Sequence, residues 1–279
     1  GLGDVYKRQP LLIPPAYDVI EAIVLGFLQG MLEWLPVSSE GVVAAVYAFS
    51  FDKPLDEAIG FALWLHAGTV PAAVIVLRRD ISILIRDLIS YPRKPSPLLR
   101  FSFLATFVSA IVGAPLLLTL GSISTIAGAA VMGVVGTFML ITGYLQIRSK
   151  PIGYRNIDQI KTSDIIATGV AQGLAVIPGL SRSGMTVVVL LTRRLRIKDA
   201  LVLSFLLSIP ASIGSALFVG IKHNLMINLE AIIAASVAFI VGIITIRGLL
   251  ALSSTIKFGW FVIAVGVAMI IGALWGEIL

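Results

Sequence analysis

The long apolar runs of this chain limit the folds open to it more than any other feature. Of its 279 residues, 58% are hydrophobic and only 13% are charged, whereas soluble domains carry about 25% charged residues. Several runs reach the ~20 residues that a helix needs to cross a bilayer, and the sequence lacks the ~10-residue alternating segments of a membrane β-barrel. The sequence therefore predicts an all-α polytopic membrane protein.

Composition also excludes several classes of site. The chain has no cysteine and two histidines, His66 and His223, which excludes disulfides, thiol catalysis and a histidine-rich metal site. The net charge is +6. In a membrane protein such an excess of basic residues is explained by their concentration in cytoplasmic loops. We therefore expect no nucleic-acid partner.

The apolar runs and the segments between them give an outline of the chain. Residues 1–18 are mixed in polarity and rich in proline, so we expect a poorly ordered extension, for which a non-native origin is one interpretation. A single membrane domain is expected over 19–279. The loops at 78–100, 148–161 and 193–198 are basic. We expect about six transmembrane helices, over 58–77, 101–119, 124–147, 199–221, 229–252 and 258–277.

One apolar segment, 164–192, contains a stretch that a membrane helix does not tolerate. Its centre, GVAQGLAVIPGLSRSG, places Pro178, Gly179, Arg182 and two serines within seven residues. A helix breaks at Pro-Gly, and an arginine at membrane depth marks a functional site by default. Broken backbone is tolerated there only where protein buries it or where it lines a cavity. The stretch is therefore predicted to be a loop that lines a polar pocket.

The three basic loops constrain the topology. The loops at 78–100 and 148–161 flank a helical hairpin, so they share one side of the membrane, and the positive-inside rule makes that side cytoplasmic. The loop at 193–198 is equally basic and is expected on the same side. Segment 164–192 then cannot cross once, which predicts a re-entrant helix–loop–helix hinged at Pro178-Gly179.

A short internal repeat predicts a second such hairpin. Gly26-x-x-Gln29-Gly30 matches Gly169-x-x-Gln172-Gly173 at an offset of 143 residues. Each half, about 19–147 and about 163–277, then comprises one re-entrant hairpin and three spans. Three is an odd number, so the halves have inverted topology and the first hairpin, 19–50, enters from outside. Such repeats place their site where the hairpins meet near the midplane.

The second hairpin has the donors of a phosphate site. Arg182 carries a planar fork of donors that suits phosphate. Ser181, Ser183 and the backbone amides freed around Gly179 and Gly184 add neutral donors, and a helix that restarts after the loop directs its positive end at an anion. The alternative is that Arg182 only pairs with Glu33 and holds the two hairpins together.

The first hairpin contributes Glu33, Ser38, Ser39 and Glu40. A serine beside a carboxylate and opposite an arginine suits phosphoryl transfer, in which the carboxylate accepts the serine proton or activates water. Alternatively, Glu33 and Glu40 hold a hard divalent cation, and the two serines cap a helix. His66 has two equally good interpretations, as a pocket-lining or as a helix-packing residue.

At these two stretches the sequence resembles the undecaprenyl-diphosphatase family of the bacitracin-resistance type. LEWLPVSSEG (32–41) and PGLSRSGMT (178–186) are similar to its two motifs, and LSFLLSIP (203–210) is similar to its next helix. The resemblance implies paired re-entrant hairpins and an integral-membrane phosphatase that converts a polyprenyl diphosphate to the monophosphate. This activity recycles the lipid carrier of peptidoglycan and other cell-envelope glycans, and it usually depends on a divalent cation, Mg or Ca.

Site roles also follow from the resemblance. It implies that Glu33 is the acidic residue, Ser39 the nucleophile and Arg182 the phosphate-binding arginine. It also implies that Ser38, Ser181, Ser183 and Thr186 line the site. From the residues themselves we further expect Gln29, Glu40, Gly179 and Gly184 to take part in substrate binding. Two positions depart from the family pattern: Gln29 stands where an acidic residue is usual, and Val42 where a histidine is usual.

The expected protein is thus a multi-pass plasma-membrane enzyme whose site opens to the outer side. A homodimer is compatible with this arrangement. The alternative function is a transporter or flippase for a polyprenyl phosphate lipid, because inverted repeats with broken helices also suit alternating access.

Overall fold

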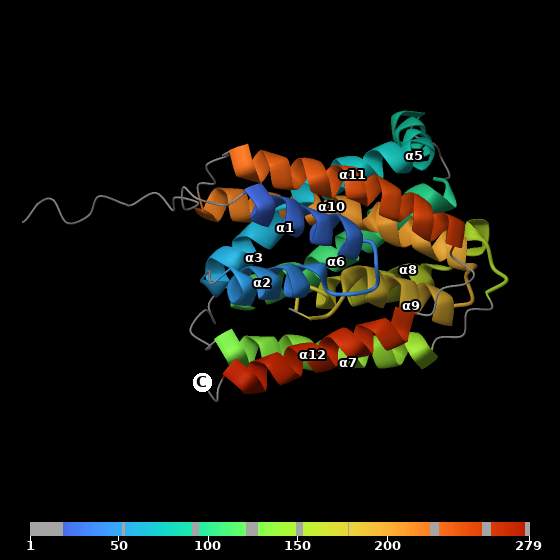
Figure 1. Ribbon diagram of the computed structural model, residues 1–279. Coiled ribbons are helices and arrows are strands. Elements are labelled where there is room, and N and C mark those ends of the chain that lie inside the picture. The colour runs from blue at the N-terminus through green and yellow to red at the C-terminus, as the bar shows by residue number, and fades with distance from the viewer. Residues whose placement is uncertain are drawn as a thin grey trace, which may run out of the picture.

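The fold of the described residues is entirely helical (Figure 1). The computed structural model describes residues 19–51, 54–90, 95–120, 128–148, 153–177, 179–223, 229–252 and 258–276. Over these ranges it contains no β-strand, which confirms the predicted all-α polytopic class. The extension at 1–18 and the hinge residue Pro178 lie outside them.

Two short helical hairpins form the centre of the molecule. Helices α1 (Val19–Leu32) and α2 (Ser39–Ser50) form the first. Helices α8 (Thr162–Leu174) and α9 (Arg182–Thr192) form the second. In each hairpin the two helices contact each other, and the connecting loop lies near the middle of the bundle (Figure 1). The two broken segments are therefore helix–loop–helix units.

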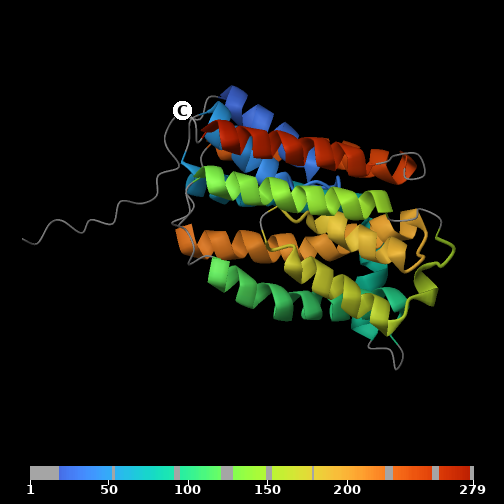
Figure 2. The ribbon, with the colours of Figure 1, turned by 90° about the horizontal axis from the view of Figure 1, so that it is seen from below.

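The remaining long helices surround the hairpins. Four described stretches are long and apolar enough to cross a membrane: Glu57–Val76, Pro97–Leu118, Ile197–Leu217 and Leu229–Leu252. The other two expected spans are helices of 21 and 19 residues that pack side by side (Figure 2). In chain order, the long helices that the structure describes without a break are α6 (Pro97–Leu120), α7 (Gly128–Arg148), α10 (Ile197–His223), α11 (Leu229–Leu252) and α12 (Phe258–Gly276).

The structure corrects two expectations about the first half. The predicted span 58–77 is two helices, α3 (Leu55–Trp64) and α4 (His66–Val76), which meet at Leu65. The basic region 78–100, expected to be a loop, begins with helix α5 (Arg78–Ser90). None of the side chains of α5 is buried. Its arginines and apolar residues suit a helix that lies in the membrane interface rather than across the bilayer.

Close packing at glycines shows that the first helix of each hairpin packs on a helix of the other half. Helix α1 packs on α11, and helix α8 packs on α6. A Cβ at Gly26 would lie 2.3 Å from the Ala234 carbonyl oxygen, and a Cβ at Gly169 would lie 2.7 Å from that of Ala105. The first helix of each hairpin therefore rests on a long helix of the other half, as an inverted repeat requires.

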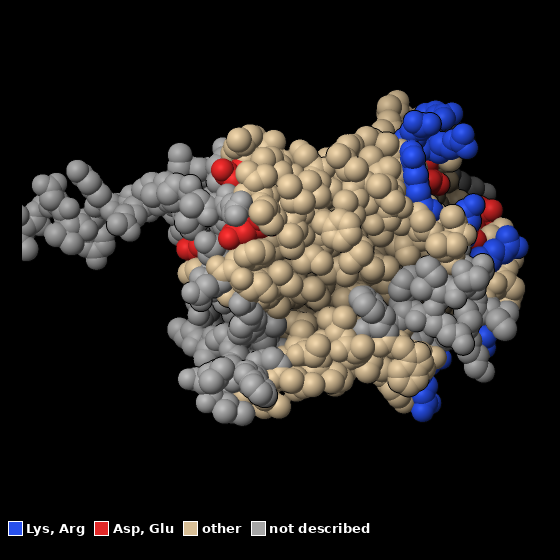
Figure 3. Space-filling view, in the orientation of Figure 1, with Lys and Arg blue, Asp and Glu red and all other residues tan. Residues whose placement is uncertain are grey.

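The basic residues gather at one end of the bundle (Figure 3). The Arg155 backbone N–H donates to the Arg194 carbonyl at 2.9 Å, and its guanidinium pairs with Asp164 at 2.7 Å. Arg100 donates to the Ile160 carbonyl at 2.9 Å. These contacts join the three basic regions, which confirms that they share one side.

The start of α8 is fixed by a carboxylate in its own first turn. The N-cap residue is Lys161, and the Asp164 carboxylate accepts the Lys161 backbone N–H at 3.0 Å. A carboxylate in the first turn also faces the positive end of the helix dipole. The second hairpin is therefore fixed to the basic end through Asp164, which pairs with Arg155 as well.

Candidate active site

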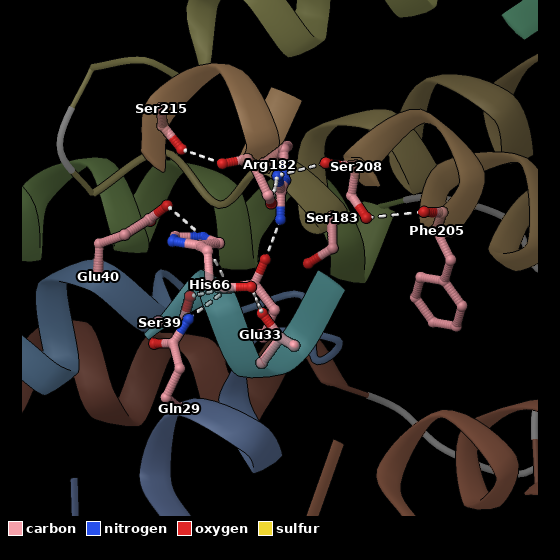
Figure 4. A network of polar contacts seen from close by, with 12 residues as sticks. Gln29, Glu33, Ser39, Glu40, His66, Arg182, Ser183, Phe205, Ser208 and Ser215 are labelled. Atoms are coloured by element: carbon pink, nitrogen blue, oxygen red, sulfur yellow. Dashed lines mark hydrogen bonds and ion pairs between the residues drawn. The ribbon is translucent and has the colours of Figure 1, made fainter. Parts of the chain in front are cut away.

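The two hairpin tips meet with the same local geometry. Ser38 caps α2, accepting the Gly41 backbone N–H at 3.4 Å, and Ser181 caps α9, accepting that of Gly184 at 3.1 Å. Ser39 and Arg182 are therefore the first helical residues of α2 and α9. Two helix N-termini, each a favourable place for an anion, thus bring these residues to one site (Figure 4).

Glu33 stands at the centre of this site, in the loop that follows α1. One carboxylate oxygen, Oε1, forms an ion pair with the Arg182 guanidinium. The other, Oε2, accepts hydrogen bonds from Ser39 Oγ at 2.7 Å and from Gln29 Nε2 at 3.0 Å. The Glu33 side chain is only 1% exposed, so its charge is stabilised by these partners rather than by water.

Helix α10 holds Arg182 in place. The Arg182 Nη1 group donates to the Ser208 carbonyl at 3.1 Å and to Ser212 Oγ at 2.6 Å. With Nη2 on Glu33, the guanidinium plane is fixed from two sides, and its side chain remains 14% exposed. The arginine is therefore positioned before any ligand arrives.

Two further residues complete the centre. His66, the first residue of α4, lies with Nε2 at 3.4 Å from Glu33 Oε2 and 3.7 Å from Glu40 Oε1. The Glu40 side chain is 37% exposed, the most open of the group. This position supports the pocket-lining interpretation of His66 over the helix-packing one. The sequence offers one clue, a histidine within an apolar span. Its partners could not be predicted from the sequence, because His66 lies far along the chain from both motifs.

The other predicted site residues make hydrogen bonds or packing contacts with other parts of the protein. Ser183 Oγ donates to the Leu35 carbonyl at 2.7 Å, which ties one hairpin loop to the other. Thr186 Oγ1 lies 2.7 Å from Ser204 Oγ. Gly179 has φ of 93°, in the left-handed region that favours glycine, and its backbone lies against Val135.

The structure thus separates the predicted site residues into two groups. It brings together Gln29, Glu33, Ser39, Glu40 and Arg182. The side chains of Ser38, Ser181, Ser183 and Thr186 cap helices or join elements, as do the backbones of Gly179 and Gly184. The capping interpretation holds for Ser38, and the pairing of Arg182 with Glu33 is present as well.

The donor set of the centre does not match a protein-built cation site. Both Glu33 oxygens already accept protein hydrogen bonds. In the part of the chain that the structure describes, no three His, Asp or Glu side chains are arranged to hold a metal ion, whereas Mg²⁺ and Ca²⁺ seek several oxygen ligands. We therefore assign neither Glu33 nor Glu40 as a metal ligand.

The geometry is suited to the transfer of a phosphoryl group. A serine hydroxyl already donates to a carboxylate that can take its proton. A fixed guanidinium lies on the other side of that carboxylate and matches the charge of phosphate oxygens. The exposed parts of Arg182 and Glu40 are where this otherwise buried centre reaches the surface.

Comparisons with known proteins agree with this arrangement. The family model for bacitracin resistance protein BacA matches residues 22–271. The chain is similar to the undecaprenyl-diphosphatase of Methanococcoides burtonii, with 37% identity over 258 residues that cover 90% of this chain and 97% of that protein. It is also similar to the undecaprenyl-diphosphatases of Haloarcula marismortui, with 36% identity over 88% of this chain and 94% of that protein, and of Saccharolobus solfataricus, with 32% identity over 93% and 97%. A match of this extent, with Glu33, Ser39 and Arg182 at one centre, means that the chain belongs to the family of bacitracin resistance protein BacA.

Proposed function

We propose that this protein is a membrane-embedded phosphatase that hydrolyses an undecaprenyl-type polyprenyl diphosphate to the monophosphate and inorganic phosphate. One observation carries the proposal. The Ser39 hydroxyl donates to Glu33, and the same carboxylate pairs with Arg182 from the other half of the chain. The names of the relatives, all undecaprenyl-diphosphatase, supply the substrate class.

In the proposed reaction the substrate phosphate competes with Glu33 for the Arg182 guanidinium. Arg182 then neutralises charge on the oxygens of the transferred group. Once released from the arginine, the Glu33 carboxylate is free to accept the Ser39 proton. Ser39 Oγ attacks the terminal phosphorus, and the lipid monophosphate leaves. The ion pair thus keeps the Glu33 carboxylate from acting as a base until the substrate phosphate replaces it on Arg182.

The cation requirement remains a prediction. Because the donor set does not fit a protein-built site, we propose that Mg²⁺ or Ca²⁺, where it is needed, arrives bound to the diphosphate oxygens. The Glu40→Gln variant should then need the same cation concentration for half-maximal rate as the wild type. A cation requirement that rises at least tenfold in Glu40→Gln, beside an unchanged Km for the lipid, would assign Glu40 as a ligand instead.

We also propose a setting in the cell. The positive-inside rule places the basic end of the bundle in the cytoplasm, and the first hairpin starts from the opposite end (Figure 1). Glu40, the most exposed residue of the centre, belongs to that hairpin. These features support a plasma-membrane enzyme whose site opens outward, where it recycles the lipid carrier for cell-wall synthesis and confers bacitracin resistance.

Phosphate release and lipid transport are separable by experiment. The purified protein in detergent should release inorganic phosphate and polyprenyl monophosphate in equal amounts from a polyprenyl diphosphate. Reconstituted protein that moves the lipid between leaflets without releasing phosphate would establish the transporter alternative. Neither the family nor the relatives favour transport.

A further inference from the structure

His66 is a buried titratable group that the reaction described above does not use. Its side chain is 1% exposed, and its Nδ1 lies 2.9 Å from the Leu63 carbonyl oxygen. A carbonyl oxygen only accepts hydrogen bonds, so Nδ1 carries hydrogen in this arrangement. Nε2 has no hydrogen-bond partner among the described residues, and it is therefore the atom through which the ring gains or loses a proton.

The free nitrogen faces the reacting centre. Nε2 lies 3.4 Å from Glu33 Oε2, the same oxygen that accepts the Ser39 hydroxyl, and 3.7 Å from Glu40 Oε1 (Figure 4). Arg182 lies on the far side of Glu33. Helices α10 and α11 also pack on α4, but their described charged residues form no ion pair with His66. In the part of the chain that the structure describes, two carboxylates and one guanidinium are thus the charges around His66.

The other half of the chain shows that packing does not require a histidine here. Thr69 Oγ1 donates to the His66 carbonyl at 3.5 Å, and Ser208 Oγ donates to the Phe205 carbonyl at 2.7 Å. A proline lies inside each helix at the same spacing, in α4 and in α10. Phe205 is therefore the counterpart of His66, and it is fully buried and packed edge-on against Trp34. An apolar ring fills this place in the fold.

We propose that His66 is a catalytic residue that carries a proton at Nε2 in each half of the hydrolysis. The proposal rests on the phosphatase function. As Ser39 Oγ bonds to the terminal phosphorus, its proton moves to Glu33 Oε2. The bond between that phosphorus and the bridging oxygen breaks, its electron pair stays on the oxygen, and His66 Nε2–H gives its proton to this leaving lipid phosphate.

The second half restores the enzyme. Water attacks the phosphoserine, its oxygen bonds to phosphorus, and one water proton passes to His66 Nε2. The bond between Ser39 Oγ and phosphorus breaks, and Glu33 returns its proton to Oγ. The sum is one lipid diphosphate and one water converted to one lipid monophosphate and one phosphate, with His66, Glu33 and Ser39 as they began.

The test uses His66→Phe, because the counterpart Phe205 shows that this ring fits the fold. We expect the variant to elute and unfold like the wild type and to keep Km for the polyprenyl diphosphate within about threefold. Its kcat should fall by about 10²–10⁴-fold, the usual contribution of a positioned acid–base group. The plot of kcat against pH should also lose the limb that reports this group. His66→Asn, which can still bond the Leu63 carbonyl, should behave in the same way.

Three outcomes separate the claims. Wild-type protein that releases no phosphate overturns the phosphatase function, and the role of His66 with it. An active wild type beside a His66→Phe with normal kcat, or with the wild-type pH profile on a lowered kcat, overturns only the role of His66. If His66→Phe does not fold, His66→Asn decides by the same two readouts.

Discussion

Ser39 and Arg182 occupy the same position in the two hairpins: each is the first residue of its helix, directly after a capping serine. The inverted arrangement brings these two helix starts together at Glu33. One position of the repeat therefore supplies a hydroxyl and the other a permanent cation. A centre for phosphoryl transfer needs both, and two identical tips would supply only one.

The pairing of Glu33 with Arg182 predicts a specific pattern of stability. Arg182→Ala leaves a carboxylate that is 1% exposed without its arginine partner, and breaking a buried ion pair typically costs about 3–5 kcal/mol. Adding Glu33→Gln removes the stranded charge, so the double variant should recover most of that loss while remaining inactive. Thermal unfolding in one detergent gives the comparison. Equal midpoints for the single and double variants would mean that the pair contributes nothing to stability.

Ser39 and Ser38 are neighbours with different expected roles. Ser39 donates to Glu33, whereas Ser38 caps α2. Ser39→Ala should abolish the acid-stable phosphoserine formed from a substrate labelled in the terminal phosphate. Ser38→Ala should still be labelled and should lose about 1 kcal/mol of stability, the usual cost of an N-cap. Labelling that survives in Ser39→Ala would move the nucleophile to another group, with water the first candidate.

Gln29 and Gln172 form a matched pair across the repeat. Gln29 Nε2 donates to Glu33 at 3.0 Å, whereas Gln172 Nε2 donates to Ser109 Oγ at 3.2 Å and to the Leu207 carbonyl at 3.3 Å. Each alanine variant should lose about 1 kcal/mol of stability. Only Gln29→Ala should also lower kcat, by about tenfold, because only Gln29 orients the catalytic carboxylate. Similar kcat values for the two variants would contradict that role.

The contact between α1 and α11 is predicted to leave no room for a side chain at two glycines of α1. A Cβ at Gly26 would lie 2.3 Å from the Ala234 carbonyl oxygen, and one at Gly30 would lie 2.7 Å from that of Ala238. Gly26→Ala should therefore destabilise the protein by about 1–3 kcal/mol through overpacking.

Gly60, inside α3, is the control for this prediction. A Cβ there meets nothing within 4 Å, and alanine favours a helix by up to about 1 kcal/mol over glycine. Gly60→Ala should thus unfold at the same temperature as the wild type or slightly above it. A Gly26→Ala variant as stable as Gly60→Ala would show that α1 does not need this close approach.

Much of the centre could be predicted from the sequence, because its motifs are local. Pro-Gly with an arginine at membrane depth indicated one loop, and the offset of 143 residues indicated the other. The basic loops then indicated that the second hairpin enters the membrane from the cytoplasmic side. The inverted halves predicted that the two hairpins meet, and the structure brings Glu33, Ser39 and Arg182 together there.

The parts that sequence patterns missed depend on three-dimensional packing. His66 reaches the centre because α3 and α4 meet at Leu65 instead of forming one straight span, and no local pattern marks that break. The roles of Ser183 and Thr186 depend on which neighbours lie within hydrogen-bond reach, Leu35 and Ser204. These contacts join segments that are far apart in the sequence or on different helices.

The central claim is that Ser39, Glu33 and Arg182 together release phosphate from a lipid diphosphate. The most direct measurement is phosphate release from a polyprenyl diphosphate by purified wild type, Ser39→Ala and the folded Glu33→Gln/Arg182→Ala double variant. The account predicts multiple turnovers by the wild type and at least 10²-fold slower release by both variants. Release by either variant at the wild-type rate would contradict the assignment of this centre as the active site.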